Sequence, residues 1–513
     1  MRRRDFIKAS SLVSAATLLP FIGRLESFWP AALAKEMTPF SAAAVQELAR
    51  ELATKKFVRP RNDLPKVLQD LNYDQYRDIR FKRERAIWSR EGLPFQVDLF
   101  HRGSFFKDPV EIFTVADGRV QRLTYTPDLF TFGSLVPPMS EKAVTDFSGF
   151  RLRAPLNHAE HFDEFVVFQG ASYFRAIAKG QQYGLAGRGL ALKTGDARGE
   201  EFPIFRTFWI ERPRPEAHTV VVHALLDSDS TTGAYRFTIR PGDSTVMDVE
   251  MTLYPRVDLT HVGLAPLTSM FFFGANDRMG IDDFRPAVHD SNGLAIWNGR
   301  GEWLWRPLIN PETLQISAFV DDNPRGFGLL QRHRDFANFQ DLEARYELRP
   351  SLWVEAIGGW GSGVVQLVEI PSWSEYHDNV VAFWRPDQPL LAHTKNHFTY
   401  RLHWCRFPPA VPSKALAMET MTGAGPEKGK RRFVIDFLGE RLKALPRDAT
   451  LEPILSTSAG VVEYPVIQPN SAAGGWRLSF VLVHGDETLC DLRCTLKLGD
   501  ELLSEVWTYR WTR

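Results

Sequence analysis

The sequence predicts an all-β protein, built as a large β-sandwich followed by a small immunoglobulin-like β-sandwich. From about residue 95 onward, short apolar runs rich in Val, Phe, Thr and Tyr are bounded by Gly, Pro, Asp or Asn, a pattern typical of packed antiparallel strands. Long periodic helices are nearly absent, which argues against a parallel α/β sheet. After a proline cluster, about 100 residues of the same character remain, which suits an immunoglobulin-like sandwich.

Residues 1–34 have the features of an export signal. Arg2, Arg3 and Arg4 precede a mildly apolar run, and Ala-Leu-Ala at 32–34 supplies an A-x-A cleavage site. The segment looks like a twin-arginine signal, so the twin-arginine export machinery is an expected partner. The apolar run is shorter than the ~20 residues of a membrane span, and no later stretch is long enough. We therefore expect a soluble periplasmic protein that begins near Lys35 and has no stable membrane anchor.

The mature chain is expected to begin with one short helix and to continue as strands. Ser41 can cap a helix in which Val45, Leu48 and Leu52 share one face. The large domain is assigned to residues 35–405. Its strand-like runs include 97–102, 111–125, 219–227, 235–255 and 363–371.

A boundary is expected at 406–413, where RFPPAVPS contains three prolines. Proline clusters stiffen linkers and do not continue central strands. Residues 414–513 then form the small domain. Its strand-like runs are 431–439, 452–467, 476–483, 490–499 and 504–511.

Composition excludes several classes of function. The 513 residues carry 62 basic and 62 acidic side chains, so no net field favours nucleic acid. The three cysteines, Cys405, Cys490 and Cys494, make neither a disulfide scaffold nor a zinc site, and buried free thiols are expected. The sequence contains no G-x-S-x-G elbow, Walker loop or strand-linked G-x-G-x-x-G. No cofactor and no metal are predicted.

Two His-Asp segments are the strongest chemical signal in the chain. VHDSNGLAIWNG contains His289 and Asp290, and YHDNVVAFWRP contains His377 and Asp378. Glycoside cleavage uses two carboxyl groups, one to protonate the leaving oxygen and one to activate water or attack the sugar. An Asp before Ser-Asn-Gly is equally a common turn, so the residues alone leave both readings open.

Several long segments, in the same order, resemble the family of periplasmic glucan biosynthesis proteins G and D. These are the two His-Asp segments together with 168–176, 184–195, 200–213, 267–277 and 349–363. The resemblance covers nearly the whole mature chain and implies a mutarotase-like sandwich followed by the small domain. It also implies hydrolysis of β-1,2-glucan, the carbohydrate expected as the partner. The twin-arginine signal resembles protein D more than protein G.

The resemblance assigns roles to individual residues. Asp378 matches the family's general acid and Asp290 its general base, which implies endo-acting hydrolysis with inversion. We expect a raised pKa for Asp378 and an ionised Asp290. His289 and His377 are expected to orient the carboxylates. Three further residues, Tyr346, Arg332 and His333, are expected to line the glucan subsites.

Tryptophans support a sugar site. Seven of the 14 lie between Trp297 and Trp384, and pyranose rings stack on aromatic faces. Any one of them can equally be a core residue of a β-sandwich. Trp360, in the glycine-rich loop GGWGSG, is the favoured stacking residue, and Trp353 is a second candidate.

Alternatives to these assignments remain open. Asp282, Asp283, Asp321 and Asp322 are competing acids. One of them could instead hold a structural turn or a calcium ion, but the Asp-x-Asp-x-Asp-Gly pattern of a calcium loop is missing. His158 and His161 lack the H-E-x-x-H spacing of a zinc site, and the charged loop 427–432 suits a solvated loop better than an anion site. The competing functions are a non-catalytic glucan binder, a transglycosylase on the same glucans, and a structural envelope protein.

Overall fold

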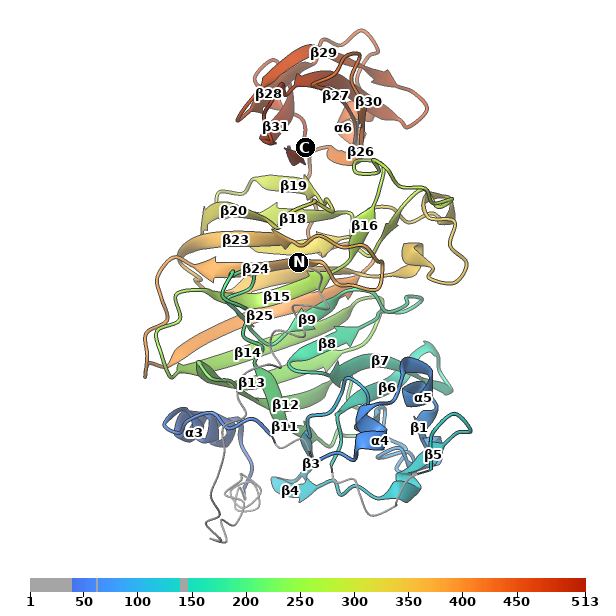
Figure 1. Cartoon of the computed structure of the whole chain (residues 1–513), viewed down its shortest axis with the longest axis vertical. Helices are drawn as coiled ribbons and strands as arrows, with labels where there is room; N and C mark the ends of the chain where they lie inside the picture. The colour runs from blue at the N-terminus through green and yellow to red at the C-terminus, as the bar shows by residue number, and fades with distance from the viewer. Residues whose placement is uncertain (1–38, 61–62, 139–145) are drawn as a thin grey trace.

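The computed structural model describes residues 39–60, 63–138 and 146–513. The prediction of an all-β fold is confirmed, because two large sheets account for most of the described chain (Figure 1). The export signal at 1–34 lies outside the described residues. Within them, no helix has the length and apolar character needed to cross a membrane.

The first sheet has 10 strands. Along its path these are β2 (Gln96–Phe100), β6 (Gly149–His158), β7 (His161–Gln169), β8 (Tyr173–Ala176), β9 (Ala186–Arg188), β15 (Val262–Ser269), β24 (Val380–Pro386), β23 (Ser362–Glu369) and β20 (Gln315–Asp322), with β10 (Ala191–Leu192) paired to β15. This sheet carries the candidate site on the face that points away from the core.

The second sheet has 15 strands. Its order is β28 (Glu452–Thr457), β31 (Leu489–Leu498), β33 (Val506–Thr512), β19 (Trp303–Pro307), β18 (Gly293–Trp297), β21 (Gly326–Leu330), β22 (Ser351–Ile357), β25 (Asn396–Cys405), β14 (Thr245–Pro255), β13 (Thr231–Arg240), β12 (Val220–Asp227), β11 (Ile204–Glu211), β3 (Glu111–Ala116) and β4 (Arg119–Arg122), with β32 (Glu501–Leu502) on β31. It begins in the C-terminal part of the chain and continues into the large part.

Smaller elements complete the fold. There is a four-stranded sheet, β26 (Leu416–Ala424), β27 (Lys430–Leu438), β30 (Gly475–Val483) and β29 (Val461–Asn470), and two ribbons, β1 (Ile79–Phe81) with β5 (Phe130–Phe132) and β16 (Phe271–Phe273) with β17 (Val288–His289). The described helices are α3 (Ala42–Ala53), α4 (Lys66–Gln69), α5 (Tyr73–Arg77), α6 (Glu440–Lys443) and the 3-10 turns η1 (Arg83–Arg85), η2 (Pro127–Leu129), η3 (Phe336–Asn338) and η4 (Tyr346–Leu348).

The predicted helix near the N-terminus is confirmed as α3. Ser41 caps it, because its side chain accepts a hydrogen bond from the Ala44 N–H at 3.2 Å. Its buried residues Val45 and Leu48 pack with Trp209 and Leu225 on the outer face of the second sheet. Strand β12 is therefore buried on both faces, and it reads as a continuous apolar run.

The main core lies between the two large sheets and is rich in aromatic rings. Phe168, Phe208 and Phe237 meet there edge to face, with ring centroids 5.2–5.4 Å apart. Each large strand sends alternate residues into this core. The other set of alternate residues on the first sheet remains available for binding.

The proline-rich segment lies between β25, which ends at Cys405, and β26, which begins at Leu416. The two parts of the chain nevertheless share one sheet. Strand β33 pairs parallel with β19, with Leu304 opposite Val506 and Trp305 opposite Trp507. This short pairing joins the small C-terminal part, drawn in orange to red in Figure 1, to the β19 edge of the large sheet.

Candidate active site

A short ribbon and one asparagine hold the two His-Asp segments together. Phe271 on β16 pairs with His289 on β17, directly before Asp290. The Phe271 N–H donates to Oδ1 of Asn379 at 2.9 Å, and Asn379 Nδ2 donates to the Phe271 carbonyl at 3.0 Å. Asn379 follows Asp378 in the sequence. Backbone pairing and this buried amide therefore bring Asp290 and Asp378 to one place.

Asp290 is the buried member of the pair. Its side chain is 4% exposed, and Arg349 Nη1 donates to its Oδ1. Burial raises the pKa of Asp290 above its ordinary value, the Arg349 charge opposes this rise, and the negative charge of Asp378 adds to it. The two carboxyl groups are therefore within electrostatic range of each other.

Asp378 lies nearer to solvent. Its side chain is 26% exposed and accepts a hydrogen bond from Nη2 of Arg175, on β8, at 3.0 Å. The sequence-based expectation placed the raised pKa on Asp378. The structure places the burial on Asp290 instead, because β17 runs under the surface whereas Asp378 sits on the loop before β24.

Tyr346 and the two histidines lie around the aspartates. Tyr346 is buried on η4, and the Arg349 guanidinium lies 4.2 Å from its ring centroid. His289 is buried and stacked on Phe271, and burial holds its pKa well below the usual range, so it is neutral. His377 lies in the loop before β24 and its N–H donates to the Ser374 carbonyl. Tyr346 and His289 are thus buried residues that pack beside Asp290, Tyr346 through Arg349 and His289 through Phe271.

Arg285 ties three loops together beside the aspartates. Its guanidinium is within 2.8 Å of Asp283, Asp341 and Glu375, which lie on three different loops. Burial raises the pKa of Tyr346, and the negative charges of Glu375 and Asp290 add to this rise. Loop residues here expose large apolar side chains, namely Phe284, Leu342, Trp373 and Tyr376. These side chains can stack on sugar rings.

Trp360 does not belong to this surface. Its side chain is 6% exposed, packs against Trp384, Phe398 and Tyr400, and donates from Nε1 to the Thr399 carbonyl at 3.2 Å. Its loop meets the Pro386 end of β24, whereas Asp378 precedes the other end, about 20 Å away along a seven-residue strand. The stacking role expected for Trp360 is therefore wrong, and the residue is core.

Trp353 is also a core residue. It is 1% exposed and stacks on Trp303 with ring centroids 5.4 Å apart, and Trp303 stacks in turn on Trp297. A Cβ at Gly326 would lie 2.5 Å from the Trp353 ring, so this strand needs a glycine to accommodate it. The glucan-binding role expected for Trp353 is therefore also wrong, because its ring is buried in the core.

Arg332 and His333 face the C-terminal strands. Arg332 forms two hydrogen bonds with Glu505, at 2.6 and 3.0 Å, and lies 3.6 Å from the Trp305 ring centroid. His333 Nε2 lies 2.9 Å from an oxygen of Glu419 on β26. The subsite role expected for Arg332 is therefore corrected, because its guanidinium is held by Glu505. His333 lies with its ring centroid 6.0 Å from that of His289, so it stays close to the site and its subsite role stays a prediction.

The competing acids hold turns. Asp283 accepts from the N–H and the guanidinium of Arg285, and Asp321 accepts from the Gly299 N–H. Asp322 meets the Ser362 hydroxyl at 3.2 Å. The turn reading of these residues accounts for all three sets of contacts. The expectation of buried free thiols at the three cysteines is confirmed.

Sequence reasoning missed the arginines. Arg175 and Arg349 occur inside FQGASYFRA and RPSLWVEAIGGWGSG, two of the segments that carry the family resemblance, but no local pattern connects them to an aspartate. Arg175 lies 203 residues from Asp378 and Arg349 lies 59 residues from Asp290. The only available signal would have been that a buried carboxylate such as Asp290 needs a cationic partner somewhere in the chain.

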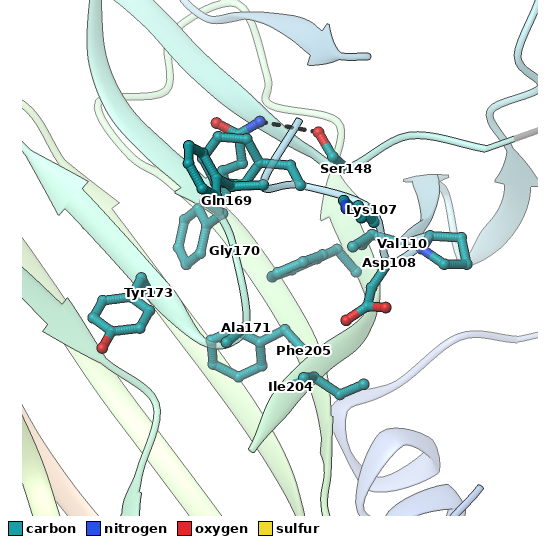
Figure 2. A pocket seen from close by; sticks show the side chains of 15 residues that line it. Lys107, Asp108, Val110, Ser148, Gln169, Gly170, Ala171, Tyr173, Ile204 and Phe205 are labelled. Carbon is teal, nitrogen blue, oxygen red and sulfur yellow. Dashed lines mark hydrogen bonds between the residues drawn. The ribbon is translucent and has the colours of Figure 1, made fainter. Parts of the chain in front are cut away.

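A small hollow elsewhere on the first sheet is too small for a sugar. It lies beside the β7–β8 turn and holds about 50 Å³, with Gln169 Nε2 donating to Ser148 Oγ at 2.9 Å (Figure 2). That volume admits only one or two water molecules. The neighbouring aspartates, of which Asp290 is buried and Asp378 is partly exposed, remain the candidate active site.

Fold and site together define a β-sandwich protein with two neighbouring carboxyl groups. The chain matches the model of the family described as periplasmic glucan biosynthesis protein, MdoG, over residues 40–511, and it belongs to that family. It is 53% identical over 513 residues to Glucans biosynthesis protein G of Bradyrhizobium diazoefficiens, with 100% of both chains covered. It is 52% identical over 477 residues to Glucans biosynthesis protein G of Vibrio cholerae, covering 92% of this chain and 87% of the relative.

These comparisons support a periplasmic glucan biosynthesis protein. The relatives carry the name of protein G, so the expected closeness to protein D is not confirmed.

Proposed function

We propose that this chain is an endo-acting, inverting hydrolase of β-1,2-glucan that shapes periplasmic glucans. The observation that carries the proposal is that the β16–β17 ribbon and the Asn379 amide hold Asp290 and Asp378 beside each other, each bonded to its own arginine. Two neighbouring carboxyl groups are what glycoside hydrolysis requires.

Asp290 is proposed as the general base. It accepts a proton from a water molecule, whose oxygen attacks the anomeric carbon. A carboxylate with a raised pKa is a stronger base, and the Arg349 charge favours the ionised form that the reaction needs. Burial and the arginine together suit Asp290 to this role.

Asp378 is proposed as the general acid. It gives its proton to the glycosidic oxygen as the bond from that oxygen to the anomeric carbon breaks. Its position at the surface lets it reach a bound chain. To donate a proton, the Asp378 carboxyl group must release its hydrogen bond from Arg175 and bind the glycosidic oxygen instead.

The decisive test uses purified mature protein, linear β-1,2-glucan and two variants, Asp378→Asn and Asp290→Asn. Each should lose about 10²–10⁴-fold in cleavage rate while still binding glucan. Asp282→Asn and Asp322→Asn are matched controls and should retain activity. A loss below about tenfold in either site variant, with the fold intact, would remove that residue from the mechanism.

A second experiment separates the acid from the base. A β-1,2-gluco-oligosaccharide with a nitrophenyl leaving group needs little protonation, because its leaving oxygen is already stable as an anion. On this substrate Asp378→Asn should recover much of its activity and Asp290→Asn should not. The reverse pattern would exchange the two roles.

The alternatives on the same site are a transglycosylase and a non-catalytic glucan binder. A transglycosylase would give longer as well as shorter chains from a single oligosaccharide. A binder would retain glucan without changing its length. We further propose that the chain is exported by the twin-arginine pathway and shares its substrate with protein D.

A further inference from the structure

A groove of about 520 Å³ lies on the same face of the first sheet as the aspartates, but near its β2 edge. Its floor is formed by outward-facing residues of β2 and β6, and its wall by α5, β1 and η1. Five arginines line it, namely Arg77, Arg80, Arg83, Arg151 and Arg153, together with one carboxylate, Asp98. Asp98 and Glu164 offset the charges of Arg151 and Arg153, and Asp78 offsets Arg80, so the excess of positive charge comes from the two remaining arginines of the groove.

Asp98 organises the floor of the groove. Its side chain is 1% exposed, and its Oδ2 accepts from Arg151 Nε and from Arg153 Nη1, both at 2.9 Å. The Arg151 guanidinium also lies 5.4 Å from the ring centroid of Phe100. The buried carboxylate thus fixes two guanidinium groups beside an aromatic ring.

The rim of the groove carries cations that lack a carboxylate. Arg77 lies over the Tyr73 ring, and Arg83 donates to the Phe162 carbonyl and lies 3.2 Å from His161 Nε2. Neither forms an ion pair with any described residue. Arg80 is paired with Asp78 at 3.3 Å and is 74% exposed. Two uncompensated guanidinium groups therefore face the solvent at the mouth of the groove.

Strand register connects the groove to the aspartates. Asp98 pairs with Arg151, Arg151 with Val167, and Val167 with Arg175, across four neighbouring strands. Directly paired residues lie on the same face, and three strand spacings amount to about 15 Å. Since Arg175 bonds to Asp378, a chain molecule bound at the aspartates can extend along this row into the groove.

We propose that this groove binds an acidic substituent, a phosphate ester or a carboxylate half-ester, carried by the glucan chain. The inference rests on the proposed function, because it takes the glucan as the molecule bound at the aspartates. Guanidinium groups bind both kinds of anion through charge-assisted hydrogen bonds. The groove would then select substituted chains, or place the cleavage point relative to a substituent.

The test compares three forms of one β-1,2-gluco-oligosaccharide: unmodified, succinylated and phosphorylated. Affinities are measured by calorimetry with the Asp378→Asn protein, so that no chain is cut. We expect at least one acidic form to bind about tenfold more tightly than the neutral form. The advantage should shrink at high ionic strength, because the rim arginines are exposed.

The site variant is Arg77→Gln/Arg83→Gln in the same background, and the matched control is Arg432→Gln/Arg447→Gln, two exposed arginines of the C-terminal part. The site variant should lose most of the preference and the control should keep it. Equal affinity for acidic and neutral chains, or equal loss in the control, would overturn the inference. Failure to bind the neutral chain at all would instead count against the proposed substrate. Comparing the succinylated and phosphorylated chains identifies the anion.

Discussion

Asn379 and Phe271 are joined by two hydrogen bonds, the amide oxygen accepting from the Phe271 N–H at 2.9 Å and the amide nitrogen donating to the Phe271 carbonyl at 3.0 Å. Asn379 also donates to the Ile370 carbonyl at 3.1 Å. One side chain thus satisfies three buried backbone groups. It also links the segment of Asp378 to the ribbon of Asp290, so the distance between the aspartates depends on it.

Asn379→Ala should lower both stability and activity. The substitution leaves buried backbone groups without partners, which costs ~1–3 kcal/mol for each unsatisfied group. Asn396→Ala is the matched control, because that amide makes one exposed hydrogen bond, to Thr394. Urea unfolding midpoints and glucan cleavage rates measure the two effects. Similar urea midpoints for both variants would show that the two hydrogen bonds between Asn379 and Phe271 do not hold their segments together.

Arg349→Met should shift the acid limb of the pH–activity profile upward. Burial raises the pKa of Asp290 and the Arg349 charge opposes it, so removal of that charge lets the pKa rise further. A base acts only above its pKa, so activity should disappear at a higher pH than in the parent protein. The control is Arg236→Met, a surface partner of Glu250. If the acid limb of the kcat/KM profile moves to lower pH, or does not move, Asp290 is not the titrating base.

Replacing Trp360 should lower stability, whereas replacing Trp373 should weaken glucan binding. Trp360→Ala empties part of the core and should cost about 3–5 kcal/mol in the free energy of unfolding. Trp373 is 70% exposed on the loop that leads to Asp378. Trp373→Ala should leave stability nearly unchanged and weaken glucan binding about fivefold, or ~1 kcal/mol, through lost apolar contact. Trp373→Phe should retain most of the affinity. If Trp360→Ala folds and binds glucan weakly while Trp373→Ala binds normally, then Trp360 does have the sugar-binding role expected from the sequence.

Replacing Arg332 should destabilise the fold, because Arg332 pairs with the buried Glu505. Glu505 is 1% exposed, so Arg332→Met leaves an unpaired buried carboxylate and should cost about 3–5 kcal/mol. The double variant Arg332→Met/Glu505→Met should recover part of the loss, as replacement of both partners by apolar groups often does. Thermal unfolding of the four proteins measures this cycle. Additive losses would mean that the pair does not couple the two parts of the fold.

Export can be tested independently of catalysis. Arg3→Lys/Arg4→Lys should leave folded precursor in the cytoplasm, because the twin-arginine pathway requires its arginines for recognition. The measurement is the amount of protein in the periplasmic fraction, compared with Arg24→Lys as a control for the loss of an arginine further along the signal. Normal periplasmic levels of the double variant would point to another export route.

The fold class was predictable because it depends on local properties. β-Branched and aromatic runs between turn residues favour strands wherever they occur, and Ser41 caps α3 with its own neighbours. The two His-Asp segments were likewise visible as short patterns. The tryptophans misled, since an aromatic residue in a glycine-rich loop has the same local sequence whether its ring faces sugar or the core.

The sequence by itself determined an all-β chain with an irregular proline segment before its last strands, and it singled out two aspartates worth testing. Tertiary structure decided which side chains meet them. Arg175 reaches Asp378 and Arg349 reaches Asp290 only because sheet register brings distant strands and loops to one face. Tertiary structure also turned Arg332 toward Glu505 and joined β19 to β33. The physical reason is that burial and charge pairing are set by contacts between residues far apart in sequence, which no local pattern encodes.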